Sequence, residues 1–289
     1  MADGVLQPLQ LLGGLFLSAL IGYVGYRREA LTPSGMAGAV LVGTLIFGFG
    51  GWEWGMLLIS FFLLSSALSF YKRQTKEALA EKFAKGSRRD LGQALANGGM
   101  GALLALAYAF TGETLLFPAF VGAMATVNAD TWATEIGVLS RRAPRLITTG
   151  TQVEPGTSGG ITLLGTLATL AGGLSMGLAA VLFLLLDGAW GGAGFELLET
   201  RVPAGVLGLL LVSGAGGLAG AFFDSLLGAT VQAIYYSPTR HKETERRVDP
   251  DGTPNSHVRG WPWLDNDWVN FISSGVGALA AAFFWALLR

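Results

Sequence analysis

The sequence predicts an all-α, polytopic transmembrane helical bundle, and three observations lead to this fold class. The 289 residues are 51% hydrophobic and only 13% charged, and the mean hydropathy is +0.50. An ordinary soluble domain carries about 25% charged residues, and here the deficit extends along the chain. The 43 glycines fit this class, because small residues let membrane helices approach closely. No linker or charge block divides the chain, so we expect residues 1–289 to form a single integral membrane domain.

About eight apolar stretches are long enough to cross a bilayer, since a spanning helix needs about 20 residues. They cover residues 5–25, 34–50, 52–71, 91–110, 114–137, 158–186, 203–236 and 268–288. The sixth and seventh stretches are long and rich in glycine, so the sequence leaves open whether their helices are broken or re-entrant, and the expected total lies between seven and nine. Thr32 beside Pro33 is typical of a helix start. The first stretch lacks a basic leader and a cleavage site, and is expected to be a retained helix.

Basic residues are concentrated in alternate connections between these stretches. Of the 19 Lys and Arg residues, 17 lie there: two in the first such loop, seven between Lys72 and Arg89, three in the third and five in the fourth. Only Arg201 and Arg289 fall on the other side. By the positive-inside rule the basic loops face the cytoplasm, and both chain termini are expected on the non-cytoplasmic side.

Carboxylates interrupt three of the apolar stretches near their predicted cytoplasmic ends. Asp130 and Glu135 follow the apolar run 120–127, Asp224 lies inside the seventh stretch, and Asp267 begins the eighth. Acids are rare at membrane depth because burying them is costly, so they usually mark a site. Clustered carboxylates repel one another unless a cation joins them, and hard divalent cations take such oxygen ligands. The sequence therefore predicts a divalent metal site at this end of the bundle.

Residues that favour phosphate binding are predicted to lie at the same cytoplasmic end of the bundle. The segment Pro155–Gly160 places glycines and hydroxyls before the sixth stretch, and the amino end of a helix favours anions. It is not a Walker A motif, because no Lys follows the glycines. Arg89 and Arg145 could neutralise phosphate oxygens, and Gln93 and Asn97 share one face of the fourth stretch. A divalent metal with a polyphosphate and arginines is the general arrangement of phosphoryl transfer.

Several kinds of catalysis are not expected. The chain has no cysteine, which excludes thiolate chemistry and cysteine-ligated metals. Its two histidines, His241 and His257, fall in one polar loop, so a Ser/His/Asp triad inside the membrane is not expected.

The motifs resemble those of a membrane family that includes the plant phytyl-phosphate kinase of tocopherol synthesis. The matching segments are Asp130–Gly137, Pro155–Gly160, Asp224–Ala229, and Asn266-Asp267 followed by Asn270, and the similarity covers about residues 30 to 275. More distantly, the pattern at 130–137 is similar to that of dolichol kinases and CTP-dependent phosphatidate cytidylyltransferases. Those enzymes continue with a Lys-Ser/Thr-x-Glu-Gly-Ser run, and Pro155–Gly160 departs from it.

This resemblance implies transfer of a phosphoryl group from a nucleoside triphosphate such as CTP to a prenyl or phytyl monophosphate, giving the diphosphate. Asp130, Asp224 and Asp267 are the expected ligands of Mg²⁺ or another divalent cation, and Arg89 joins them as a catalytic residue. The expected substrate and nucleotide contacts are Asn97, Asn128, Thr134, Glu135, Arg145, Gly156, Thr157, Ser158, Gly159, Gly160, Ser225, Asn266 and Asn270.

Two other functions stay open at this stage. The same site could attack the alpha phosphate, which makes a nucleotidyltransferase that leaves a CDP-lipid. Alternatively, Asp130 and Asp224 could carry the ion of a cation-coupled transporter, as acids near broken helices do. The expected partners are the lipid bilayer, the nucleotide and the lipid monophosphate; no nucleic acid is expected, and homo-oligomerisation stays open.

Overall fold

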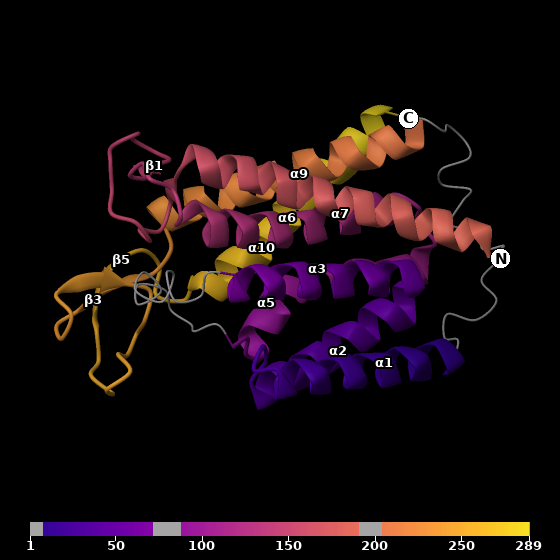
Figure 1. Ribbon diagram of the computed structural model, residues 1–289, viewed down its shortest axis with the longest axis horizontal. Helices are drawn as coiled ribbons and strands as arrows, with labels where there is room; N and C mark the ends of the chain where they lie inside the picture. The colour runs from indigo at the N-terminus through magenta and orange to yellow at the C-terminus, as the bar shows by residue number, and fades with distance from the viewer. Residues whose placement is uncertain (1–7, 72–87, 191–203, 289) are drawn as a thin grey trace.

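Eight long helices form one bundle in the computed structural model, which describes residues 8–71, 88–190 and 204–288 (Figure 1). The helices are α1 (Pro8–Arg27), α2 (Pro33–Gly50), α3 (Trp52–Phe70), α5 (Leu91–Thr111), α6 (Leu116–Gly137), α7 (Leu163–Ala189), α9 (Ala204–Thr230) and α10 (Asn266–Leu288). Each corresponds to one of the eight predicted stretches, so the fold class is confirmed. The side chain of Thr32 caps α2 by accepting a hydrogen bond from the N–H of Gly35 at 3.1 Å.

The two glycine-rich stretches form continuous helices, neither broken nor re-entrant, which settles the alternative that the sequence left open. Helices α7 and α9 each run for 27 residues. Their glycines serve close packing instead. A Cβ on Gly173 of α7 would lie 3.0 Å from the carbonyl oxygen of Ser213, and one on Gly216 of α9 would lie 2.9 Å from that of Gly277. The small residues therefore bring the helices together without interrupting them.

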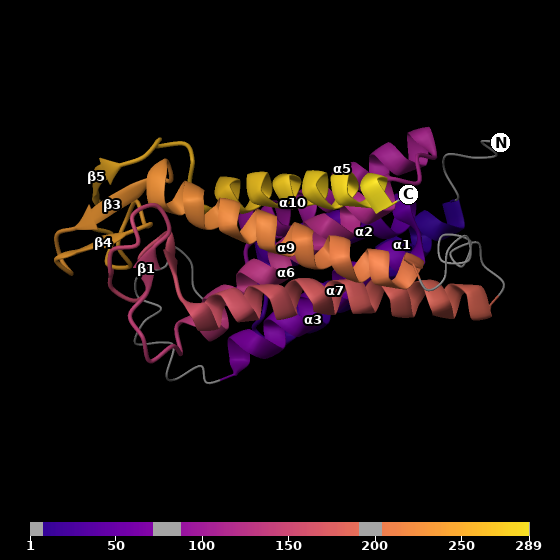
Figure 2. The same cartoon turned by 90° about the horizontal axis from the view of Figure 1, so that it is seen from above.

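Helix α6 lies at the centre of the bundle (Figures 1 and 2). Every residue from Phe117 to Ala129 is buried, and α3, α5, α7, α9 and α10 all pack against it. The other seven described helices are long and apolar enough to cross a membrane. Polar residues lower the hydropathy of α6, and it tolerates them because protein rather than lipid surrounds it.

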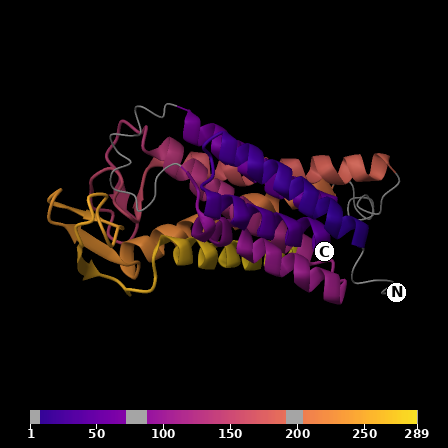
Figure 3. The same ribbon diagram turned by 90° about the horizontal axis from the view of Figure 1, so that it is seen from below.

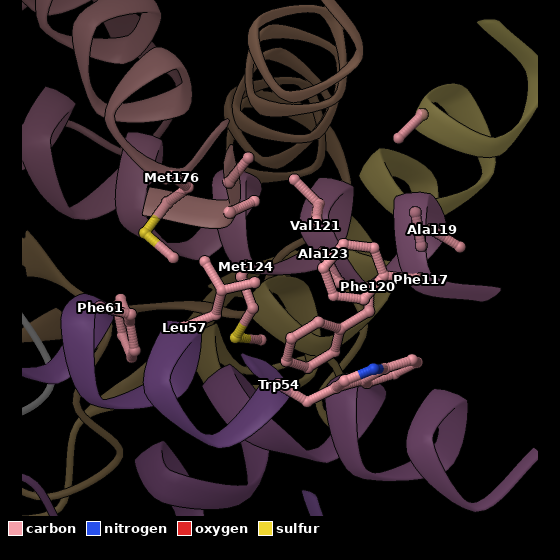
Figure 4. Packing of buried hydrophobic residues seen from close by; sticks show 14 of the residues in the cluster. Trp54, Leu57, Phe61, Phe117, Ala119, Phe120, Val121, Ala123, Met124 and Met176 are labelled. Carbon is pink, nitrogen blue, oxygen red and sulfur yellow. The ribbon is translucent and has the colours of Figure 1, made fainter. Parts of the chain in front are cut away.

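Aromatic and aliphatic side chains fill the contact between α3 and α6 (Figure 4). The ring of Trp54 lies 4.5 Å from that of Phe120 and 5.5 Å from that of Phe117, measured between centroids. Leu57 and Met124 are fully buried beside them. This apolar core holds α6 in place in the part of the bundle that precedes its polar end.

Short strands form a cap at one end of the bundle, which the all-helical prediction did not include (Figures 2 and 3). Strand β1 (Arg145–Leu146) pairs antiparallel with β2 (Gly160–Ile161). Beyond α9, a three-stranded antiparallel sheet has the order β4-β3-β5, built from β3 (Ile234–Ser237), β4 (Lys242–Thr244) and β5 (Ser256–Arg259). Helices α3, α6 and α9 end at this cap, whereas α1 begins and α10 ends at the opposite end (Figure 1). The loops of the cap therefore meet the ends of the helices that carry Asp130 and Asp224.

Candidate functional site

A polar cavity of about 330 Å³ lies where the ends of α6 and α9 and the beginning of α7 meet the cap. The charged side chains that line it in the described part of the chain are four carboxylates and two guanidinium groups, from Asp130, Glu135, Asp224, Glu245, Arg89 and Arg142. Hydroxyl groups, amides and glycines provide most of the remaining lining, and no His or Lys of the described segments 8–71, 88–190 and 204–288 belongs to it. Such a cavity suits an anionic ligand that is accompanied by a cation.

Three carboxylates lie close enough in this cavity to repel one another. Asp224 interacts electrostatically with Asp130 and with Glu245, and Asp130 also interacts with Glu245. Oδ2 of Asp224 is buried and has no hydrogen-bond partner among the described residues. A buried acceptor without a donor is costly, and a bound cation would remove both this cost and the mutual repulsion. The donor set therefore fits a hard divalent cation.

Arg89 is fixed at the opposite side of the cavity by its backbone and its side chain. Its N–H donates to the carbonyl oxygen of Ala30, and its own carbonyl oxygen accepts from the N–H of Thr32, both at 2.9 Å. Nη1 donates to Oγ of Ser66 at 3.2 Å, and the guanidinium lies 5.7 Å from the ring centroid of Phe61. Burial lowers the pKa of Arg89 to about 10, while Glu135 acts to raise it. The side chain therefore remains a cation at neutral pH.

Glu135 and Asp130 both line the cavity but meet different partners. Five residues along an α-helix turn the side chain by about 140°. Oε1 of Glu135 accepts a hydrogen bond from Oγ of Ser69 on α3 at 2.7 Å, on the side of Arg89. Asp130 instead interacts electrostatically with Asp224 and Glu245. One helix thus supplies an acid to each side of the cavity.

The glycine-rich segment lines the cavity as a turn that precedes the helix. It was predicted to begin the sixth span, but Gly160 and Ile161 form β2, and α7 begins at Leu163 with Thr162 as its cap. The pairing of β2 with β1 keeps these residues out of the helix. Gly159 has a φ of +81°, and a Cβ there would lie 2.5 Å from that of Ala229 on α9. The turn therefore packs against α9 at a position where only glycine fits.

The cavity brings together most of the predicted site residues. They are Arg89, Asn97, Asp130, Thr134, Glu135, Gly156, Thr157, Ser158, Gly159, Gly160, Asp224, Ser225, Asn266 and Asn270. Asn128, Arg145 and Asp267 do not line it. Within the described parts of the chain, no three acidic or histidine side chains are grouped as ready metal ligands. Asp130, Asp224 and Asp267 therefore do not form a preassembled three-acid centre.

The residues outside the cavity have other surroundings. Nδ2 of Asn128 donates to the carbonyl oxygen of Gly172 at 2.8 Å and to Oγ of Ser175 at 3.0 Å, which joins α6 to α7. Arg145 is exposed in β1, and its Nη1 donates to the carbonyl oxygen of Gly150 at 2.7 Å. Its neighbour Arg142 lines the cavity instead.

Several lining residues were not predicted as site residues. Ser69, Thr166 and Thr169 are isolated hydroxyl groups in apolar helices, where no spacing distinguishes them from packing residues, whereas Thr131 lies inside the motif Asp130–Gly137. Glu245 lies in a loop rich in charge, and only the folding of the cap places it beside Asp130 and Asp224. No pattern in the sequence could have identified it.

The fold and this cavity define an integral, multi-pass membrane protein with a polar site at one end of its helices. The chain belongs to the integral membrane protein family DUF92, whose family model matches residues 16–278. This confirms the family resemblance found in the sequence motifs.

Similar proteins span most of this chain. Protein PGR of Arabidopsis thaliana is 34% identical over 278 residues, which are 91% of this chain and 92% of that protein. An uncharacterized membrane protein of Methanocaldococcus jannaschii is 32% identical, with 74% of this chain and 82% of that protein covered. The chloroplastic protein VTE6 of Arabidopsis thaliana is 30% identical over 87% of this chain and 64% of its own length. No solved structure matches the chain.

Proposed function

We propose that this protein is a membrane-embedded isoprenoid-phosphate kinase, which transfers the terminal phosphoryl group of a nucleoside triphosphate such as CTP to a prenyl or phytyl monophosphate. The observation that carries this proposal is the pairing, in one cavity, of the carboxylates of Asp130 and Asp224 with the turn at 156–160 and Arg89. The likeness to VTE6 and the motifs shared with the phytyl-phosphate kinase family support the same substrate class. The basic residues of the loops favour a cavity that faces the cytoplasm.

Asp130 and Asp224 would hold a Mg²⁺ ion together with the phosphates of the nucleotide. Magnesium usually binds one or two carboxylates plus substrate phosphates rather than a cage made of protein alone, so a third acid such as Asp267 is not required in the cavity. When bound, the metal neutralises the charge that develops on the transferred phosphoryl group. Ser158 and the glycines of the turn would position the phosphates of the nucleotide, and Arg89 would neutralise phosphate oxygens of the reacting substrates.

In the proposed reaction, an oxygen of the acceptor monophosphate forms a bond to the terminal phosphorus of the nucleotide. The bond from that phosphorus to the bridging oxygen breaks, and the nucleoside diphosphate leaves with the electron pair. A phosphate monoester is already ionised near neutral pH, so the acceptor needs no general base. Among the described residues, neither His nor Lys lines the cavity, which agrees with an acceptor that needs no base.

The test uses the full-length protein in lipid nanodiscs with a nucleoside triphosphate labelled at the terminal phosphate and farnesyl or phytyl monophosphate. We expect a labelled lipid diphosphate that forms only with Mg²⁺ and is abolished by chelation. Asp224→Asn should reduce the rate by at least 100-fold, because it removes a charge beside the metal. The exposed Asp251, which lies in the cap outside the cavity, provides the control, and Asp251→Asn should retain the full rate.

Two outcomes would replace this proposal with another. Release of pyrophosphate with formation of a CDP-lipid, seen in the product mass, would establish nucleotidyl transfer. Ion-dependent uptake into proteoliposomes without consumption of nucleotide would establish a transporter. Full kinase activity in both Asp130→Asn and Asp224→Asn would contradict the assignment of the site.

A further inference from the structure

A second, apolar pocket of about 90 Å³ lies between α1, α2, α3 and α5. Most of its lining is aliphatic or aromatic, as with Leu17 and Ile21 on α1, Val42 on α2 and Leu58 on α3. Three residues, Arg89, Gln93 and Asn97, line both this pocket and the polar cavity. The two spaces therefore meet at a polar boundary that contains one cation.

The packing of α1 leaves this pocket beside the edge of the bundle. Helix α1 packs mainly along α2 and makes only slight contact with α3, where Gly25 meets Phe62. Its outer face is exposed and apolar, with Leu12 and Phe16 among the exposed side chains. A lipid in the bilayer could therefore reach the pocket between α1 and α3.

The far end of the pocket is closed by close packing. A Cβ on Gly55 of α3 would lie 2.2 Å from Cδ2 of Phe47 on α2, so α2 and α3 are in contact there. From Phe62 to Gly55 the lining follows α3 for seven residues, which is about 10 Å along the helix. The pocket thus extends from Arg89 away from the cap and into the apolar part of the bundle.

We infer that this pocket binds the first part of the isoprenoid chain of the lipid monophosphate, whose phosphate meets Arg89. This inference rests on the proposed function. An apolar space with a fixed cation at its mouth is complementary to an amphiphile with an anionic end. The guanidinium is held there by Ser66 and lies against the rings of Phe61 and Phe62. An acceptor bound in this way enters from the bilayer and presents its phosphate to the nucleotide across the polar cavity.

The test combines photolabelling with a matched pair of variants. Farnesyl monophosphate that carries a diazirine near the middle of its chain is irradiated with the full-length protein in nanodiscs, and the labelled residues are mapped by mass spectrometry. We expect label on α1, α2, α3 or α5 within the pocket, and competition by unlabelled farnesyl monophosphate. Ala39→Phe fills the pocket and should weaken labelling at least tenfold, whereas Ala37→Phe, on the exposed face of the same helix, should not.

A second pair covers the case in which Ala39→Phe does not fold. Leu17→Trp narrows the pocket from α1, and Leu20→Trp adds the same bulk on the exposed face of that helix. Only Leu17→Trp should weaken labelling. Label confined to other helices, or equal competition by an alkyl phosphate without isoprene units, would overturn the inference.

The labelling result is independent of catalysis. Labelling of the pocket without any phosphoryl transfer would reject the proposed kinase and keep the lipid site. Phosphoryl transfer to farnesyl monophosphate that is unchanged in Ala39→Phe and Leu17→Trp would reject the pocket and keep the kinase.

Discussion

The hydroxyl group of Ser158 donates a hydrogen bond of 2.7 Å to Oε1 of Glu245, and this contact joins the glycine-rich turn to the loop that follows β4 in the cap. The same carboxylate oxygen accepts from Nε2 of Gln232, just beyond the end of α9, at 3.0 Å. Glu245 also adds a third negative charge beside Asp130 and Asp224. The cap therefore completes the polar cavity, both by fixing the turn and by contributing to its electrostatic field.

Replacement of this carboxylate should alter the requirement for metal. Glu245→Gln keeps an oxygen that can accept from Ser158 but removes one negative charge near Asp130 and Asp224. We expect the Mg²⁺ concentration for half-maximal phosphoryl transfer to rise by roughly tenfold, which corresponds to about 1.4 kcal/mol. A titration of activity with Mg²⁺ measures this change.

Glu243 offers a matched control for that titration, because it is an exposed acid on β4 only two residues away. Glu243→Gln should leave the Mg²⁺ requirement within twofold of the unmodified protein. An equal shift in both variants would mean that the general charge of the cap, and not the position of Glu245, sets the affinity for metal.

The close approach of the glycine turn to α9 leads to a second prediction. Gly159→Ala places a Cβ within 2.5 Å of the Ala229 side chain and forces an L-residue into a left-handed conformation. Such a conformation alone costs about 1–2 kcal/mol. We expect the clash to displace the turn, and the KM for the nucleotide to rise at least tenfold.

Gly150→Ala is a control that introduces the same kind of backbone strain as Gly159→Ala but no steric clash. Gly150 also has a positive φ, of +70°, but a Cβ there would have no atom within 4 Å and the residue does not line the cavity. Gly150→Ala should lower the free energy of unfolding by about as much as the backbone strain in Gly159→Ala does. The KM for the nucleotide should stay unchanged. Equal kinetics of the two variants would contradict a role for the turn in nucleotide binding.

The sequence predicted the helices well because the membrane imposes one physical rule on them. Every backbone polar group in a spanning segment must be satisfied within the helix, so apolar length alone identifies the elements. The glycines left open whether α7 and α9 are broken, and in the structure Gly173 and Gly216 permit close packing between continuous helices. Helix packing of this kind depends on the neighbouring helix and cannot be inferred from one segment.

The site residues that could be predicted from the sequence are polar residues in apolar helices, where burial is unfavourable unless the residue has a function. Asp130 and Asp224 are acids in apolar helices, and the cost of placing them there makes them candidates from the sequence alone. Arg142 and Glu245 belong to polar loops, where a charge costs little and carries no such signal. Asn128 was expected among the substrate and nucleotide contacts, and in the structure its side-chain amide joins α6 to α7.

The position of Arg89, just before α5, depends on Gly35 in α2. A Cβ on Gly35 would lie 2.0 Å from the carbonyl oxygen of Arg89, so Gly35→Ala cannot keep the backbone contact between the start of α2 and residue 89. We expect a marked loss of phosphoryl transfer and a lower melting temperature. Gly13→Ala on the exposed side of α1 is the control, since a Cβ there meets no atom within 4 Å. It should stabilise the helix slightly, by up to about 1 kcal/mol, without changing activity.

Asp249 makes the stability of the cap depend on pH. Hydrogen bonds from the hydroxyl groups of Ser237 and Thr239, followed by those from Asn255 and Arg240, hold the pKa of its carboxyl well below its usual range. A carboxyl whose pKa is lower in the folded than in the unfolded chain stabilises the fold at pH values above the unfolded pKa of about 3.9. This stabilisation is lost progressively as the pH falls below that value toward the folded pKa. We therefore expect the cap to be stable at pH 7 and to loosen in acid.

Hydrogen exchange of residues 234–259 measures this dependence, when each rate is divided by the rate expected for an unstructured chain at the same pH. Protection of these amides should be constant between pH 7 and 5 and should fall below about pH 4. Asp249→Asn should reduce protection at pH 7 and make it less dependent on pH, because the side chain no longer titrates. Asp251→Asn changes an exposed acid two residues away and should leave protection at pH 7 unchanged. Protection in Asp249→Asn that matches the unmodified protein at pH 7 would show that Asp249 does not hold the sheet together.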